Sequence, residues 1–272
     1  MALSVTLGRL SRLCYRSSLQ SRKAKPEAER RAIKVKSKEK ALDAALDYVK
    51  DGMTIMIGGF LGQNAPLACI DKLVERGVKD LTLITAVNAY VGGGFGIGKL
   101  IENKQIKKYI GSHIGTCPAA VELYKKGELE VDYYPQGTVI EKIRAGGAGL
   151  GGVLTPVGVG TLMEQGKQKL VIDNREYLVE TALKANVGII RGYKADKIGN
   201  ILYRGTYNSN PVMALAADYV IAEVDYVVEP GEIEPDRVGT PGILVDAVVL
   251  GYGEEKTQEI FKNLWIRDKK LA

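Results

Sequence analysis

The sequence predicts an α/β protein with a single open, mostly parallel sheet and helices on both of its faces. Its 272 residues, of which 46% are apolar and 26% charged, are typical of a globular chain that can build one large core. Strand, loop and helix segments alternate along the chain. The strand segments are apolar runs without polar alternation, which indicates a parallel sheet covered on both faces.

Helices are expected where apolar residues recur at helical spacing or where proline and glycine mark the two ends of a segment. In Ala41 to Val49 the apolar residues share one face, and Pro66 begins a helix that Gly77 ends. The other expected helices cover 118–127, 138–145, 211–217 and 251–272. The expected strands cover 53–57, 81–85, 108–112, 129–134, 169–173, 187–192 and 219–224.

Positive charge is concentrated at the N-terminus. Residues 1–40 contain twelve Lys and Arg and only three Glu, so they account for more than the whole net charge of +6 and leave the body slightly acidic. We therefore divide the chain into a basic extension, 1–36, and a folded domain, 37–272. The extension is rich in Arg and Ser and has no acidic residue before Glu27, which is typical of a transit peptide. A cytoplasmic protein with a basic tail is the other interpretation, and a mitochondrial one follows if the extension is a transit peptide.

Several classes of function are disfavoured. The body has no basic stripe with interleaved aromatic residues, which argues against nucleic-acid binding. The longest uncharged stretch, Ala145 to Met163, contains seven Gly and Pro156, so no membrane span is expected. Three Cys without a C-x-x-C spacing and a single His, His113, argue against a metal site. We expect His113 near a strand end, bonded to a backbone carbonyl. We expect no permanently bound cofactor.

A G-x-G-x-x-G pattern at Gly147, Gly149 and Gly152 suggests a dinucleotide site. Such a fingerprint follows a strand and begins a helix. Here a predicted helix, 138–145, precedes the glycines, and a loop rich in Pro and Gly follows. The order is reversed, which disfavours an NAD-dependent oxidoreductase. An anion site or a close backbone approach remains open for this segment.

Several segments together resemble the α subunits of family I coenzyme A transferases. They are DGMTIMIGGF (51–60), the glycine-rich GELEVDYYPQGTVIEKIRAGGAGLGGVLTPVGVGT (127–161), YKADKIGNILYRGT (193–206), NPVMALAADYVIAEV (210–224) and TPGILVDAVV (240–249). The resemblance runs from about Ser37 to Val249.

The resemblance implies transfer of CoA from a short-chain acyl-CoA to a free 3-oxo or short-chain fatty acid, with the CoA thioester as a substrate. A glutamate attacks the thioester, and a glutamyl-CoA thioester forms on it. In the family this glutamate lies in an S-E-N-G motif of the β subunit, and the motif is absent from this sequence. The nearest match, around Glu102, is interpreted as a solvated surface acid. The resemblance thus implies no catalytic residue here, and a β partner in an αβ or α2β2 assembly. A non-catalytic subunit of the same fold is the alternative.

The resemblance also implies which residues line the substrate site. Gly58 and Gly59 would let the thioester approach the backbone, and Phe60 would pack against the pantetheine or acyl chain or lie in the core. Asn88 would donate to an anionic oxygen. Gln136, Gly137, Gly146, Gly147 and Gly149 would line the interface side of the cleft, unless these glycines serve only close packing. Departures from the family pattern at Asn64, Ala89 and Cys117 indicate altered specificity or loss of activity.

Overall fold

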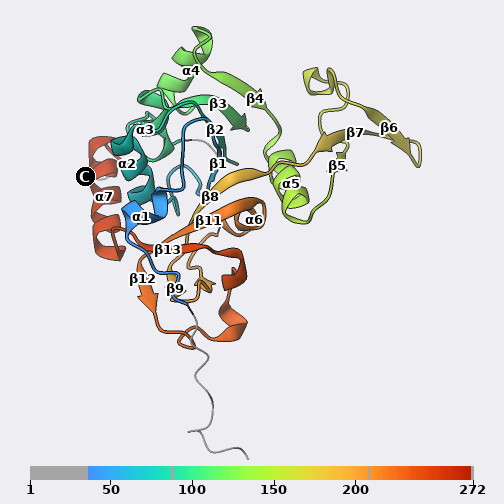
Figure 1. The fold of residues 1–272 in the computed structure, drawn as a ribbon. Coiled ribbons are helices and arrows are strands. Elements are labelled where there is room, and N and C mark those ends of the chain that lie inside the picture. The colour runs from blue at the N-terminus through green and yellow to red at the C-terminus, as the bar shows by residue number, and fades with distance from the viewer. Residues whose placement is uncertain (1–35, 87–88, 208, 271–272) are drawn as a thin grey trace, which may run out of the picture. The chain divides into compact units, whose positions relative to one another are not determined.

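The computed structural model describes residues 36–86, 89–207 and 209–270. From Ser37 onward the chain folds as one compact unit. Within this unit a central sheet lies between two groups of helices, and a small antiparallel sheet extends beyond α5 (Figure 1).

The central sheet has seven strands in the order β13-β11-β8-β1-β2-β3-β4, and every neighbouring pair is parallel. The strands are β1 (Thr54–Ile57), β2 (Leu81–Ile84), β3 (Ile106–Gly111), β4 (Glu130–Tyr133), β8 (Ala185–Arg191), β11 (Ala217–Val224) and β13 (Ala247–Leu250). The chain adds strands outward from β1 to β4 and then returns to β8 on the other side of β1. The β1–β8 boundary is therefore the switch point, where open α/β sheets bind ligands at their carboxyl edge.

Helices cover both faces of this sheet. They are α1 (Leu42–Leu46), α2 (Leu67–Arg76), α3 (Ile97–Glu102), α4 (Pro118–Lys125), α5 (Gln136–Gly147), α6 (Asn210–Leu215) and α7 (Glu254–Arg267). On β1, Ile55 and Ile57 belong to the core shared with α1 to α4 and α7, whereas Met56 belongs to the core shared with α5 and α6. This alternation follows from the period of two in a strand. The predicted fold class is confirmed.

A short hairpin extends the main fold. The strands β9 (Lys194–Asp196), β10 (Ile201–Leu202) and β12 (Tyr226–Val228) form a three-stranded sheet. The side chain of Asp196 accepts hydrogen bonds from the backbone of Ile198 and Asn200, which shapes the β9–β10 turn. Three short 3₁₀ helices, Leu162–Glu164, Pro235–Arg237 and Gly242–Leu244, lie in the connections.

A second antiparallel sheet, which we call the arm, comprises β5 (Gly152–Thr155), β6 (Lys169–Ile172) and β7 (Arg175–Thr181). It extends from the end of α5, away from the central sheet (Figure 1). Residues 169–173 were expected to form a strand of the buried sheet, and this expectation is wrong. All four residues of β6 are exposed. A short apolar run predicts a strand but does not show which sheet the strand joins.

Buried charges hold the root of the arm against α5. Lys142 of α5 donates to Glu180 of β7 at 3.0 Å, and the two side chains are only 2% and 3% exposed. Lys167 forms a second ion pair with Glu180. The ammonium groups of Lys142 and Lys167 lie 4.3 and 4.9 Å from the centre of the Tyr134 ring. A buried carboxylate between two cations is satisfied only when β7 and α5 keep this position.

Replacing Lys142 tests this attachment. We expect Lys142→Met to lower the free energy of unfolding by about 3 kcal/mol, because Glu180 would stay buried with only one cation. Urea denaturation measures the change. The control is Lys126→Met, which removes an exposed ion pair with Glu122 and should leave the unfolding midpoint almost unchanged. Equal effects of the two substitutions would contradict the structural role of Lys142.

Candidate functional site

The carboxyl ends of β1 and β8 meet at the switch point, and Gly58 follows β1 there. The Gly58 N–H donates to the Ile189 carbonyl at 3.1 Å, which ties the end of β1 to β8. A Cβ added to Gly58 would lie 1.9 Å from Oδ1 of Asn210. Since real Cβ atoms do not approach so closely, only glycine fits at this position. Gly58 therefore lets an amide side chain reach the backbone at the switch point.

Asn210 joins three segments at this point. It is fully buried at the start of α6. Its Oδ1 accepts from the Arg191 N–H at 2.9 Å, and its Nδ2 donates to the carbonyls of Asn64 at 3.2 Å and Tyr207 at 3.0 Å. One side chain thus connects β8, the turn after β1 and the loop before α6. Because a buried amide without partners costs free energy, these contacts fix the relative positions of the three segments.

The turn after β1 is a tight hairpin. Phe60 and Gln63 exchange two backbone hydrogen bonds of 2.9 Å, and the residues between them, Leu61 and Gly62, have φ values of 49° and 85°. Two positive φ values are typical of a type I′ turn, and a leucine in this region is strained. The Phe60 side chain is 37% exposed, so it does not lie in the core. A strained backbone that presents an exposed aromatic ring is a common feature of ligand sites.

The departure at Asn64 keeps the backbone that a glycine would provide. Asn64 has a φ of 49°, in the left-handed region that Gly and Asn tolerate best. Its side-chain Nδ2 also donates to the Thr206 carbonyl. The asparagine therefore preserves the turn and attaches it to the loop at 203–207.

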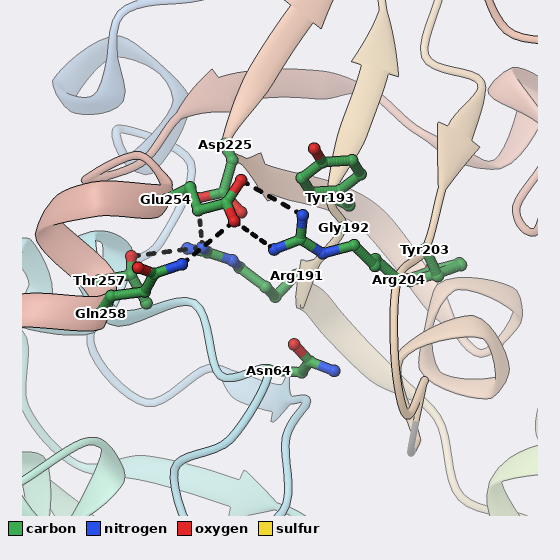
Figure 2. Close-up of a pocket in the computed structure, with 10 residues that line it drawn as sticks. All are labelled: Asn64, Arg191, Gly192, Tyr193, Tyr203, Arg204, Asp225, Glu254, Thr257 and Gln258. Atoms are coloured by element: carbon green, nitrogen blue, oxygen red, sulfur yellow. Dashed lines mark hydrogen bonds and ion pairs between the residues drawn. The ribbon is translucent and has the colours of Figure 1, made fainter. Parts of the chain in front are cut away.

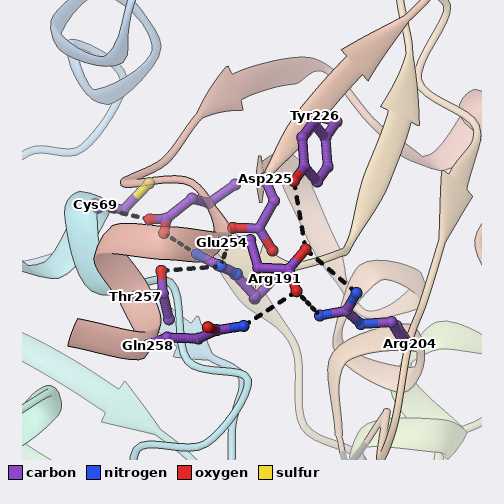
Figure 3. Close-up of polar contacts among 9 residues, drawn as sticks. Cys69, Arg191, Arg204, Asp225, Tyr226, Glu254, Thr257 and Gln258 are labelled. Carbon is purple, nitrogen blue, oxygen red and sulfur yellow. Dashed lines mark hydrogen bonds and ion pairs between the residues drawn. The ribbon is translucent and has the colours of Figure 1, made fainter. Parts of the chain in front are cut away.

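A buried ion cluster lies beneath the site (Figure 3). Arg191 pairs with Glu223 and Asp225 at 2.6 Å each, and the Cys69 N–H donates to Glu223 at 2.8 Å. Burial raises the pKa of the Glu223 and Asp225 carboxyls, against the opposing charge of Arg191. Burial also raises the pKa of the Cys69 thiol. Glu223 is 0% exposed, so its carboxylate holds the strands together and cannot reach a substrate.

Two adjoining cavities open above this cluster. The inner cavity, of 130 Å³, is drawn in Figure 2 and is lined by Asn64, Arg191, Gly192, Tyr193, Tyr203, Arg204, Asp225, Glu254, Thr257 and Gln258. Arg204 pairs with Glu254 at 2.6 Å, and its guanidinium lies 4.2 Å from the centre of the Tyr193 ring. This ion pair lowers the pKa of Glu254. Every carboxylate of the inner cavity therefore faces an arginine.

The second cavity, which we call the α7 groove, has a volume of 460 Å³. It is lined by Gln63, Asn64, Arg204, Gly205, Thr206, Thr257, Gln258, Phe261, Lys262 and Trp265. Asn64, Arg204, Thr257 and Gln258 border both cavities. The two cavities thus form one polar and aromatic cleft at the carboxyl edge of the sheet, between the turn after β1 and helix α7.

The other predicted site residues lie elsewhere or are not described. Asn88 lies outside the described residues. Gln136 and Gly137 are exposed in the first turn of α5, after β4. Gly137 borders a third cavity, of 370 Å³, with Thr138 and Glu141 of α5 and with β5 of the arm. The structure therefore does not place them in the cleft with Gly58.

Gly146 and Gly147 end α5 at the opposite edge of the sheet. An added Cβ would lie 2.0 Å from the Leu183 carbonyl at Gly146 and 2.5 Å from Leu215 at Gly147. Leu183 precedes β8 and Leu215 precedes β11, so these contacts lie at the amino edge. Both glycines serve close packing there. Gly149 is exposed with a φ of 73°. Helix α5 precedes these glycines and strand β5 follows, the reverse of a dinucleotide fingerprint.

Three further residues can be placed. His113 lies just after β3, as expected, but its Nδ1 contacts the Ser112 hydroxyl at 3.1 Å rather than a backbone carbonyl. Glu102 is exposed, and it also accepts from the Gly94 N–H at 2.6 Å. Cys117 is buried at the start of α4. Within the described ranges, no group of three or more His, Cys, Asp or Glu could hold a metal ion.

Sequence reasoning missed Arg191, Arg204 and Asn210, and it did not assign the α7 residues to the site. The signal for Arg191 was an arginine at the end of an apolar strand, with acidic residues at the end of another, Glu223 and Asp225. The order in which the strands are arranged was needed to bring them together. The loop at 203–211 was expected to be polar and close to a ligand or an interface, and it does border both cavities.

The fold and the cleft define an α/β protein that binds a ligand at the carboxyl edge of a parallel sheet. Residues 38–251 match the model of the family described as coenzyme A transferase. The alpha subunit of acetate CoA-transferase from Escherichia coli (strain K12) is 46% identical over 217 residues, 79% of this chain and 98% of that one. The acetoacetyl-CoA:acetate/butyrate CoA transferase alpha subunit of Clostridium acetobutylicum is 49% identical over 203 residues, 74% of this chain and 92% of that one. The chain belongs to the coenzyme A transferase family.

Solved structures share the fold. An acyl-CoA transferase from Escherichia coli O157:H7, in a thioester complex with CoA, has a TM-score of 0.74 at 23% identity, over 79% of this chain and 50% of that one. Glutaconate coenzyme A-transferase from Acidaminococcus fermentans has a TM-score of 0.69 at 24% identity, over 79% of this chain and 75% of that one. This chain thus spans half the length of the first. In the described part of the chain, no helix is long and apolar enough to cross a membrane.

Replacing Gly58 tests the contact at the switch point. We expect Gly58→Ala to lower the free energy of unfolding by about 1–3 kcal/mol, because the new methyl group displaces Asn210. Gly137→Ala is the control, since no heavy atom lies within 4 Å of the added Cβ. In an Asn210→Ala background the cost of Gly58→Ala should shrink, as expected for residues in contact. An equal cost in both backgrounds would show that Asn210 is not the obstacle.

Proposed function

We propose that this chain is the α subunit of a CoA-transferase that moves CoA from a short-chain acyl-CoA to a free carboxylic acid. The nucleophilic glutamate comes from a separate β subunit, in an αβ or α2β2 assembly. The observation that carries the proposal is the family match over 38–251, together with relatives that are named alpha subunits and are covered almost completely. A subunit of a succinyl-CoA:3-ketoacid coenzyme A transferase from Helicobacter pylori is 42% identical over 80% of this chain and 94% of that one, in line with a 3-oxo acid as one substrate class.

The need for a second subunit is supported in two ways. The acyl-CoA transferase chain is about twice as long as the part that this chain matches, so its other half would correspond to a separate partner. In the described residues, the carboxylates of the inner cavity are paired with Arg191 or Arg204. A carboxylate that already balances a buried cation is a poor nucleophile, because its attack would leave that cation unpaired.

The chemistry then divides into two half-reactions. The partner glutamate attacks the acyl-CoA carbonyl, which forms an acyl-glutamyl anhydride and releases the CoA thiolate. The thiolate attacks the glutamyl carbonyl, which releases the first carboxylate and leaves a glutamyl-CoA thioester. The acceptor acid reverses the sequence. This chain would provide the wall of the cleft: the small Gly58 and Gly59 allow close approach to the backbone, and the exposed Phe60 contacts the acyl or pantetheine chain.

We place the protein in the cytoplasm, or in the mitochondrion if residues 1–36 act as a transit peptide. The fluorescence of a fusion to the full chain, compared with a fusion that starts at Ser37, separates the two locations. A mitochondrial signal that requires residues 1–36 would support the second location.

Co-expression with a β subunit tests the proposal. We expect no exchange of CoA between butyryl-CoA and acetoacetate with this chain alone, and exchange with ping-pong kinetics in the complex. Changing the S-E-N-G glutamate of the partner to Gln should abolish both the exchange and the borohydride trapping of its thioester. Full activity of this chain alone would overturn the proposal. A stable complex without exchange for any acyl-CoA would favour a non-catalytic subunit.

Phe60 provides a test of the cleft wall. We expect Phe60→Ala to raise the KM for acyl-CoA in the complex by about tenfold, because an aromatic contact of about 1.4 kcal/mol is lost. Phe60→Leu should recover part of this loss. The control is Tyr124→Ala, which removes an exposed aromatic residue on α4. An unchanged KM in Phe60→Ala would show that the ring does not contact the substrate.

A further inference from the structure

Helix α7 lies outside the part of the chain that matches the family model. The match ends at residue 251, and α7 begins at Glu254. The helix nevertheless packs firmly on the domain, beside α2 and α3 (Figure 1). Leu264 is buried in the main core, and the rings of Phe261 and Phe95 meet edge to face at 5.3 Å. The helix is therefore an integral wall of the cleft, added to the shared family fold.

One side of the α7 groove is aromatic. Phe261 and Trp265 lie one helical turn apart on α7, with ring centres 5.9 Å from each other, and both line the groove. The opposite side belongs to the turn after β1 and to the loop at 204–206. A volume of 460 Å³, with mixed apolar and polar walls, is in the range of small-molecule sites.

The charge of the groove is also one-sided. Its lining includes two cations, Arg204 and Lys262, and no carboxylate. Glu254 neutralises Arg204 at 2.6 Å. Lys262 has no ion pair or hydrogen bond among the described residues. The groove thus presents one uncompensated positive charge beside an aromatic surface. This balance suits a monoanion with an apolar chain, whereas the phosphates of coenzyme A would require more positive charge.

We propose that the α7 groove binds the free carboxylic acid substrate, with the carboxylate at Lys262 and the apolar chain against Phe261 and Trp265. Longer chains cover more of the aromatic surface, so the groove favours acids longer than acetate. The assignment of this acid as the acceptor rests on the proposed function. The binding itself does not, because it requires only residues of this chain.

The chain carries its own optical probe of this site. Trp265 is the only tryptophan in the sequence and forms part of the groove wall. Titrating the full chain with hexanoate should change the tryptophan fluorescence in a saturable way. Butyrate should bind more weakly, by about threefold to fourfold for each methylene removed. Hexan-1-ol, which has the same chain without the charge, should bind at least about tenfold more weakly than hexanoate.

A matched pair of lysine variants tests the charge. Lys262→Met should weaken hexanoate binding by about tenfold and leave hexan-1-ol unchanged. Lys256→Met, on the same helix but outside the groove, should leave both unchanged; Lys256 lies over the Tyr252 ring. The proposal is overturned if hexanoate gives no saturable change, if hexanoate and hexan-1-ol bind equally, or if Lys262→Met binds hexanoate as the parent chain does.

Kinetics of the complex with its β subunit test the role of the acid. Lys262→Met should raise the KM for hexanoate by about tenfold and leave the KM for acyl-CoA unchanged. If the variant loses hexanoate binding but keeps its KM for the acid, the groove is not the acceptor site. If the complex has no transfer activity while the fluorescence titration behaves as expected, the proposed function fails and the carboxylate site stands.

Discussion

The contact between the Asn210 amide and the backbone at the switch point determines the arrangement of the cleft. Asn210 accepts from the Arg191 N–H and donates to carbonyls in two loops, and Gly58 leaves the space in which it does so. The end of β8, the turn after β1 and the loop before α6 would otherwise be free to separate at the open edge of the sheet. A single buried side chain with three bonded partners prevents this, because opening any of these contacts leaves a polar group unsatisfied.

The charges below the cleft have a different task. Arg191, Glu223 and Asp225 lie at the ends of neighbouring strands, and burial makes each ion dependent on the others. Gly251 is part of the same arrangement, since an added Cβ would lie 2.6 Å from Glu223. The family glutamate chemistry needs a carboxylate that can change its bonding during the reaction. The carboxylates of this cluster are committed to folding, which agrees with a nucleophile from another chain.

The sequence predicted the elements better than their associations. Continuous apolar runs identified the strands of the central sheet, and proline and glycine marked the ends of α2 and α4. Gly58 and Gly59 were assigned to the carboxyl edge because both follow the first strand. The pairing of Arg191 with Glu223 could not be predicted, because it depends on which strands are neighbours. Gly146 and Gly147 resembled loop glycines, whereas they are helical, and the reason for their small size lies in Leu183 and Leu215, which are distant in sequence.

The arm shows how electrostatics can define a position as well as an energy. Lys142 and Glu180 are both buried, and β-strand side chains alternate between two faces. Sliding β7 along α5 by one residue would turn Glu180 toward the other face and leave Lys142 without a counter-charge. Intermediate positions are therefore penalised as strongly as complete detachment. The ion pair acts as a register lock, and the exposed apolar strand β6 is held at a fixed distance and angle from the central sheet rather than swinging on a flexible hinge.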